Sequence, residues 1–375
     1  AKQFASYGHF RLNDIIKNER PDVFMGVQDI WALYPILKAP WFNKIKTVLW
    51  STLDSRPVHK MALEPSKACK EGDFWSWSNF VETPMKESGY PNVKTMHGPL
   101  DCKDFYRKTN TERQILRKNN NITSDCFVIG FVFRNQLRKS VPNLLEGYSL
   151  FKKANPDVKS KLLLHTCFNE GWDIMGMCKN DYKIEEADIL TTYICPKCLE
   201  FEVREFKGEK QDCKHCKTKG VCQTVHPGLG VTEDQLNNIY NLMDVYCHPM
   251  NSGGQEIPAC SEAKLCELIT LVTSYSCGEE ICEEGSGSLP LDWFKYRDLT
   301  QSQFIKASTS PYSIQKQLTK VYKMTEQQKR EMGKTARAWA LRNYSIEEIG
   351  PQIEKILDQT PLTNYDFNFE EEKKN

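Results

Sequence analysis

Short apolar runs alternate with amphipathic segments along most of this chain. In the first third, strand-like runs occur at residues 23–27, 47–50, 74–77 and 92–98. Apolar residues at helical spacing occupy residues 11–18, before the first run, and residues 79–89, between the third and the fourth. Such alternation is typical of α/β folds built on parallel sheets.

A polar and basic stretch at residues 106–123 predicts a linker or a linking helix, and a second α/β series follows it. The strands expected in this series are residues 126–133, 161–165, 220–225, 245–249 and 269–274. The helices expected are residues 143–156, 232–244 and 262–268, and residues 313–359 are expected to be helical throughout. Two details support the helices: Leu144, Leu145, Tyr148 and Phe151 share one apolar face, and Thr232 with Gln235 fits a capping box.

The length of 375 residues suits two domains of ordinary size. We expect an N-terminal domain at residues 1–122, a C-terminal domain at residues 123–345, and a helix with a frayed tail at residues 346–375. The helix at residues 11–18 leads directly into a buried strand. We therefore expect earlier strands of the first sheet to be missing from this sequence, which makes the N-terminal domain incomplete.

Composition excludes some classes of protein. No run of about 18 apolar residues occurs, so we expect no membrane span. The net charge of +1 provides no overall attraction to nucleic acid or anionic lipid. The fifteen cysteines are odd in number and scattered through predicted strands and helices, which favours reduced thiols and a cytoplasmic location, including the cytoplasm of a virus-infected host cell.

Two C-x2-C pairs interrupt the α/β alternation. They are formed by Cys195, Cys198, Cys213 and Cys216, with fourteen residues between the pairs. Four thiolates presented from two tight turns suit a tetrahedral Zn²⁺ site, and a closed four-sulfur site is structural rather than catalytic. The intervening segment alternates and turns at Lys207 and Gly208, so we expect the hairpin of a zinc ribbon, inserted at residues 193–222 of the C-terminal domain. The alternative is four unrelated cysteines in a cysteine-rich chain.

The stretch SGGQEIPACSE, at residues 252–262, lies between a predicted strand and a predicted helix. Its adjacent glycines, Gly253 and Gly254, allow main chain to approach another group closely, and the following helix directs N–H groups toward the same place. Gln255, Glu256 and Glu262 supply polar side chains. An ordinary turn is the alternative for these residues taken alone.

The order of elements over residues 127–345 resembles the nucleotide-binding half of the GT-B-fold glycosyltransferases, in particular their large retaining family-4 group. Residues 129–148 resemble the family's first strand and loop, and the resemblance implies that Arg134 and Lys139 hold the diphosphate of a nucleotide-sugar donor. Residues 252–274 resemble the donor loop with its Glu-x7-Glu pattern, which implies that Glu262 binds the ribose hydroxyls.

The first position of the Glu-x7-Glu pattern departs from the family, because Gly254 stands there. Gln255 and Glu256 are the nearest polar substitutes for contact with the sugar. The physical chemistry agrees with the other assignments. A diphosphate needs cations and backbone N–H groups, which Gly253 and Gly254 would bring close, and a carboxylate can accept from two vicinal hydroxyls.

On the acceptor side, three polar residues follow predicted strands of the N-terminal domain: Asp29, Asp54 and His97. They are candidate catalytic residues, although a capping or turn role suits each of them equally well.

The resemblance implies two Rossmann-like domains with parallel sheets, and transfer of a hexosyl or pentosyl group with retention. The acceptor expected is a glycan, a protein or a modified DNA base. Three alternatives stay open: a GT-B epimerase, a GT-B phosphorylase, and a catalytically degenerate scaffold acting as a zinc-ribbon binding module. The missing first Glu favours the last of these.

Overall fold

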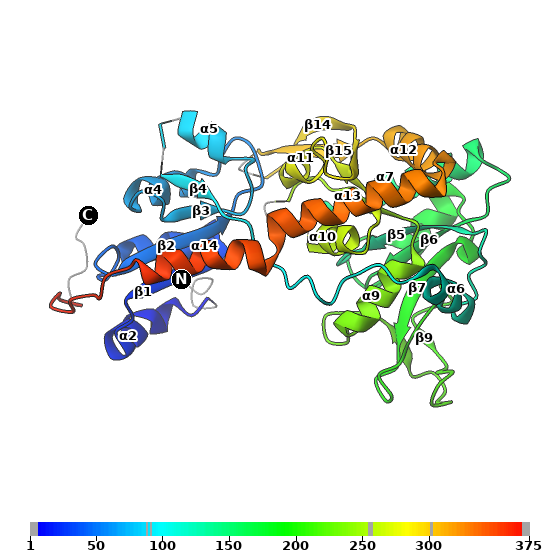
Figure 1. The fold of residues 1–375 in the computed structure, drawn as a ribbon, viewed down its shortest axis with the longest axis horizontal. Helices are drawn as coiled ribbons and strands as arrows, with labels where there is room; N and C mark the ends of the chain where they lie inside the picture. Colours follow the sequence, from blue (N-terminus) through cyan, green and yellow to red (C-terminus); the bar gives the residue numbers. More distant parts are fainter. Residues whose placement is uncertain (1–6, 88, 91, 254–257, 301–302, 370–375) are drawn as a thin grey trace.

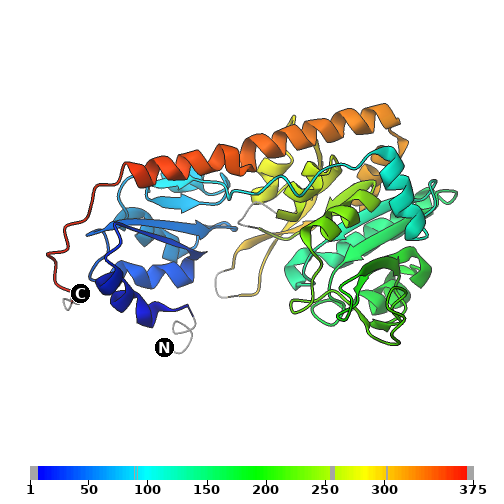
Figure 2. The same cartoon turned by 60° about the horizontal axis from the view of Figure 1, so that its bottom comes forward.

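The structure is a computed structural model that describes residues 7–369 except residues 88, 91, 254–257 and 301–302. Two α/β domains lie next to each other, and each is built on its own sheet (Figures 1 and 2). Among the described residues, no helix is both long enough and apolar enough to cross a bilayer.

The N-terminal domain contains a four-stranded parallel sheet in the order β1-β2-β3-β4. Its strands are β1 (Val23–Asp29), β2 (Lys46–Thr52), β3 (Phe74–Ser76) and β4 (Val93–Thr95), which confirms the four predicted strands. The accompanying helices are α2 (His9–Glu19), α3 (Ile30–Leu33), α4 (Lys60–Ala68) and α5 (Glu82–Glu87). The five central residues of β2 are all buried, as expected for an inner strand covered on both faces.

The C-terminal domain has a larger sheet in the order β13-β12-β11-β5-β6-β7-β10-β9, with β8 paired to β7 as well. The parallel part consists of β5 (Phe127–Val132), β6 (Ser160–His165), β7 (Ile189–Ile194), β11 (Val245–His248), β12 (Ile269–Thr273) and β13 (Ser288–Leu291). The antiparallel additions are β8 (Phe201–Glu205), β9 (Lys210–Gln211) and β10 (Cys222–Thr224). The sequence did not predict β7 or β13.

The main helices of this domain are α7 (Val141–Ala154), α9 (Glu233–Leu242), α10 (Pro258–Leu265), α12 (Pro311–Lys323) and α13 (Glu326–Tyr344). The predicted apolar face of α7 is confirmed, since its four residues are fully buried. The capping box of α9 is also confirmed, with the Thr232 hydroxyl accepting from the backbone of Gln235.

The prediction that residues 313–359 are helical throughout is confirmed except at two short breaks. Three helices occupy this region: α12, α13 and α14 (Ile346–Asp358). The chain leaves the helical conformation at Met324 and Thr325 and again at Ser345. At the first break, the Thr325 hydroxyl caps α13 by accepting from the backbone N–H of Gln328. This hydrogen bond satisfies a backbone donor that the start of a new helix would otherwise leave without a partner.

Two C-terminal elements tie the domains together. Helices α13 and α14 run along both domains in Figure 2, and α14 packs its Ile349 against the N-terminal domain near Trp50 and Trp75. The antiparallel hairpin of β14 (Trp293–Arg297) and β15 (Ile305–Thr309) also reaches the N-terminal domain. There the backbone N–H of Ile305 donates to the carbonyl of Arg56 at 2.7 Å.

Candidate functional site

A cavity of about 560 Å³ lies at the carboxyl edge of the C-terminal sheet. Its walls come from the loops after β5, β6, β10 and β11 and from the first two turns of α10. They include Arg134, Lys139, His165, His248 and Glu262. Ligands of parallel α/β sheets bind at this edge, because the loops that follow the strands converge there. The structure therefore brings Arg134, Lys139 and Glu262 into one pocket.

Lys139 is a partly buried cation of this pocket, and among the described residues it forms no ion pair with a carboxylate. Its Nζ lies 3.1 Å from Nε2 of His248, whose Nδ1 lies 3.0 Å from the Tyr246 hydroxyl. Burial lowers the pKa of His248 well below its ordinary value, so the imidazole is neutral and supplies no charge. Burial, reinforced by the neighbouring Arg138, lowers the pKa of the Lys139 ammonium to about 8. An anion in the cavity would offset this loss of hydration.

Arg134 lies at the rim and is largely exposed, with a side chain 58% accessible. Its guanidinium forms a forked pair with the Glu170 carboxylate, at 3.0 and 3.1 Å. Exposed pairs of this kind contribute little free energy, so exchange of Glu170 for a phosphate oxygen would cost little.

Glu262 lies in the second turn of α10, because the helix begins at Pro258, four residues earlier than the sequence predicted. Its Oε2 accepts from the Tyr240 hydroxyl at 2.6 Å. Among the residues that the structure describes, its Oε1 has no hydrogen-bond partner. Burial raises the pKa of the Glu262 carboxyl, and the Tyr240 hydrogen bond opposes this shift. The carboxylate is thus anchored through one oxygen and has acceptor capacity left on the other.

Three residues of the predicted donor loop lie outside the described residues: Gly254, Gln255 and Glu256. Gly253 is described. Its N–H donates to the Ser276 hydroxyl at 3.3 Å, and its carbonyl accepts from Ser276 Oγ and from the N–H of Cys277. The predicted contact of Gly253 with phosphate stays a prediction.

Asp54 is the acceptor-side candidate that lies beside this loop. Its Oδ2 accepts from the hydroxyl of Ser252, the first residue of the loop, at 3.1 Å. Lys306 of β15 joins the two domains at the same point, donating from Nζ to Ser55 Oγ at 2.6 Å and to Ser252 Oγ at 2.8 Å, with Asp54 Oδ2 at 3.7 Å. Sequence reasoning missed Lys306, and no local pattern marks it.

The other two acceptor-side candidates lie in different surroundings. Asp29 ends β1 and accepts from the hydroxyl of Thr52, at the end of the neighbouring strand β2. His97 pairs through Nε2 with the Glu280 carboxylate of α11 (Cys277–Ile281), so it links the two domains. None of the three acceptor-side candidates, Asp54 included, is among the residues that line the cavity described above.

The four cysteines of the predicted metal site come together. The ligand atoms of Cys195, Cys198, Cys213 and Cys216 all lie within 4.8 Å of one another. The Sγ–Sγ distances are 3.7 Å for Cys195–Cys216 and 3.7 Å for Cys198–Cys213. A tetrahedron with about 2.3 Å from metal to sulfur has edges of about 3.8 Å, so the thiols present fit Zn²⁺.

The hairpin expected between the two cysteine pairs is not formed as predicted. Strand β8 pairs with β7, whereas β9 pairs with β10, and the two strands do not pair with each other. This pairing arises because the edge of β7 that faces away from β6 has backbone N–H and C=O groups that no strand of the parallel sheet uses. Strand β8 forms hydrogen bonds with these groups before the chain turns toward β9. The ribbon is thereby continuous with the C-terminal sheet.

Comparison with known proteins identifies the fold. No protein-family model matches the sequence, and no curated protein matches it. Solved structures do match. A glycosyltransferase from Rickettsia africae superposes with a TM-score of 0.63 at 13% identity, over 93% of this chain and 79% of its own. Sucrose-phosphate synthase from Thermosynechococcus elongatus superposes with a TM-score of 0.61 at 12% identity, over 94% of this chain and 76% of its own. HepE from Anabaena, in complex with UDP, superposes with a TM-score of 0.63 at 13% identity, over 92% of this chain and 80% of its own. The chain has the two-domain GT-B architecture with a four-cysteine insertion.

Proposed function

We propose that this protein is a glycosyltransferase that takes a hexosyl or pentosyl group from a nucleoside-diphosphate sugar, with retention of the anomeric configuration. The observation that carries the proposal is the pocket that combines Lys139, whose ammonium lies against a neutral imidazole, with the anchored carboxylate of Glu262. A diphosphate and a ribose diol are the groups that such a cation and such an acceptor bind. The similar Anabaena HepE was solved with UDP and with UDP-glucose, which supports this donor class.

In this proposal the two domains have separate tasks. The C-terminal domain binds the donor diphosphate with Lys139 and Arg134, the glycine-rich loop supplies backbone N–H groups, and Gln255 or Glu256 contacts the sugar. The N-terminal domain presents the acceptor, and Asp54 is the candidate catalytic residue beside the donor loop. The acceptor classes to test are a glycan, a protein and a modified DNA base. The fifteen cysteines, odd in number and scattered along the chain, suit a reducing, cytoplasm-like compartment.

We also propose that the four-cysteine cluster holds one structural Zn²⁺. The four thiolates would fill the coordination shell, so the metal would have no open position for substrate. It would stabilise the ribbon next to β7 and would take no part in glycosyl transfer.

The direct test of the donor proposal is calorimetric titration of the protein with UDP-glucose and with sugar nucleotides of other bases. The Lys139→Met variant removes the buried cation with little change of volume. Lys153→Met is the matched control, since Lys153 is exposed on α7. We expect Lys139→Met to weaken binding at least tenfold and Lys153→Met to leave it unchanged. If no sugar nucleotide binds, or if both variants bind like the parent, the proposal is wrong.

Retention and transfer are tested on the products. NMR of the released sugar, or of the glycosylated acceptor, reports the anomeric configuration, and mass spectrometry over an acceptor panel reports the transferred mass. Release of a free sugar nucleotide with altered stereochemistry, in the absence of any acceptor, would instead establish an epimerase.

A further inference from the structure

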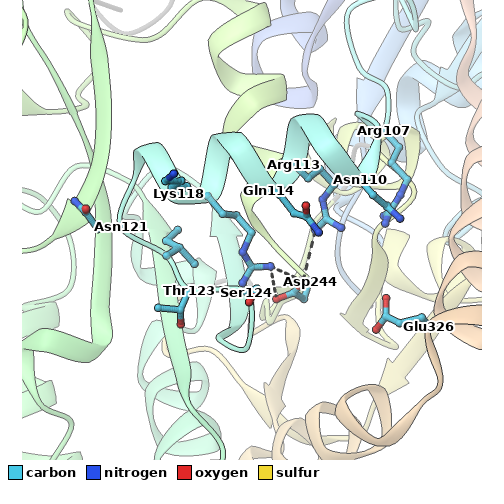
Figure 3. A pocket seen from close by; sticks show the side chains of 12 residues that line it. Arg107, Asn110, Arg113, Gln114, Lys118, Asn121, Thr123, Ser124, Asp244 and Glu326 are labelled. Carbon is cyan, nitrogen blue, oxygen red and sulfur yellow. Dashed lines mark hydrogen bonds and ion pairs between the residues drawn. The ribbon is translucent and has the colours of Figure 1, made fainter.

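The side chains in Figure 3 line a larger cavity, of about 960 Å³. It lies at the edge of the C-terminal sheet opposite the donor pocket. One wall is α6 (Asn110–Asn119), the helix that links the two domains. The floor contains Asp244, which immediately precedes β11, and Ser124, which precedes β5. Since His248 ends β11 in the donor pocket, the two cavities lie at opposite ends of the same parallel strands.

The charged side chains that line this cavity are predominantly basic. They are Arg107, Arg113, Arg117 and Lys118 against Asp244 and Glu326, which is four positive and two negative charges, a local net charge of +2. The whole chain carries only +1. This cavity is therefore locally basic in a chain that is close to neutral overall.

Two of the arginines have structural partners. Arg117 donates to both oxygens of Asp244, at 2.9 and 3.1 Å, and Arg113 lies 3.5 Å from the same carboxylate. Arg113 also donates to the carbonyls of Asn241 and Met243, at 2.9 and 2.7 Å. Asp244 additionally accepts from the backbone of Val128. The Asp244 carboxylate thus compensates the charge of two guanidinium groups and also accepts a hydrogen bond from strand β5.

Arg107 is the least compensated of the three arginines. Its side chain is 15% accessible, and its nearest carboxylate, Glu267, lies 3.9 Å from Nε. Among the described residues, Nε has no hydrogen-bond partner although it is buried. The pKa of Arg107 is lowered by burial, and that of Arg113 is lowered to about 10 by burial and by Arg107. These groups repel one another, and an anion between them would relieve the repulsion.

We propose that this cavity is a second ligand site, separate from the donor pocket, which binds a small phosphate-bearing molecule such as a sugar phosphate or a mononucleotide. Arg107 would contact the phosphate with the forked donors of its guanidinium, and Lys118 would add charge. The exposed side chains of Asn110, Gln114 and Ser124 line the same cavity and can bind the hydroxyls of a sugar. The volume lies at the upper end of the range of small-molecule sites.

The test is titration of the full chain with inorganic phosphate, glucose 6-phosphate and AMP, followed by calorimetry and by the thermal midpoint. Arg107→Gln removes the least compensated arginine and leaves the Arg113, Arg117 and Asp244 network in place. Arg342→Gln is the matched control, since Arg342 lies on α13 and outside the cavity. A third variant, Lys139→Met, removes the cation of the donor pocket.

We expect saturable binding that Arg107→Gln weakens about tenfold or more, because one charged hydrogen-bonding group is lost. Arg342→Gln and Lys139→Met should bind like the parent. A preference for glucose 6-phosphate or AMP over inorganic phosphate would identify a phosphate ester as the ligand, and equal affinities would identify the phosphate alone.

Three results would overturn the proposal. One is the absence of binding at millimolar ligand. Another is binding that Lys139→Met removes and Arg107→Gln does not, because the anion would then occupy the donor pocket. The third is binding of a short duplex DNA that Arg107→Gln weakens and that neither phosphate ester displaces, because the arginines would then contact a nucleic-acid backbone. None of these measurements depends on transferase activity, so they are independent of the proposed function.

Discussion

Replacement of Glu262 by Gln distinguishes a ligand-binding carboxylate from a structural one. The variant keeps the shape of the side chain and an acceptor for the Tyr240 hydroxyl, which lies 2.6 Å from Oε2. It removes the charge and one of the two acceptor oxygens. A hydrogen bond to a charged group contributes about 1.5–3 kcal/mol, so donor affinity should fall by a factor of about ten to one hundred and fifty.

The same substitution should not destabilise the fold. Burial raises the pKa of Glu262, which means that the folded state disfavours the charged form. A carboxyl with a raised pKa binds more protons in the folded state than in the unfolded state, so its contribution to stability is lost as the pH rises through the folded-state pKa. At neutral pH the uncharged Glu262→Gln variant should therefore unfold at the same temperature as the parent or at a higher one.

Calorimetry with UDP-glucose and thermal unfolding at pH 7 measure the two quantities on one preparation. Tyr240→Phe serves as a comparison, because it removes the hydroxyl that anchors the carboxylate and leaves the charge. We expect it to weaken binding less than Glu262→Gln does. A Glu262→Gln variant that binds UDP-glucose as tightly as the parent, or that loses affinity only because it unfolds, would refute the assigned role of Glu262.

Three further predictions concern other parts of the molecule. Because the pKa of Lys139 is lowered to about 8, donor binding should weaken as the pH rises above 8, by up to about tenfold per pH unit; a pH series of titrations checks this, and a flat profile to pH 9.5 would contradict it. Purified protein should contain one equivalent of zinc per chain, and Cys198→Ser should lower that content and the thermal midpoint; metal analysis that finds less than half an equivalent in the parent would contradict the site. Lys306→Met should lower the free energy of unfolding by about 1–2 kcal/mol and reduce kcat more than donor affinity, whereas Lys295→Met, on the exposed side of the adjacent strand β14, should change neither; equal effects of the two variants in denaturant titration would exclude a role of Lys306 in fixing the donor loop.

The sequence by itself determined the features that depend on local spacing. Buried parallel strands such as β5 and β11 appear as short apolar runs, because both of their faces are covered. The spacing of Cys195 and Cys198, and of Cys213 and Cys216, predicted the cluster, because a two-residue gap turns both thiols toward one point. Glu262 could be placed near the carboxyl edge of the sheet from the order of strand, loop and helix alone.

Only the tertiary structure decided the features that depend on contacts between distant segments. Strand β7 has residues typical of a strand, but its place between β6 on one side and β8 and β10 on the other depends on contacts that its own sequence does not specify. The pairing of β8 with β7, and not with β9, depends on which sheet edge lies nearby. Lys306 became a candidate only when a hairpin brought it to Asp54, about 250 residues away in the chain. The cavity around Arg107 likewise exists because α6, the starts of two strands and the beginning of α13 meet there. Charge at each of these positions is visible in the sequence, but the sum of charges around one cavity is a property of the fold.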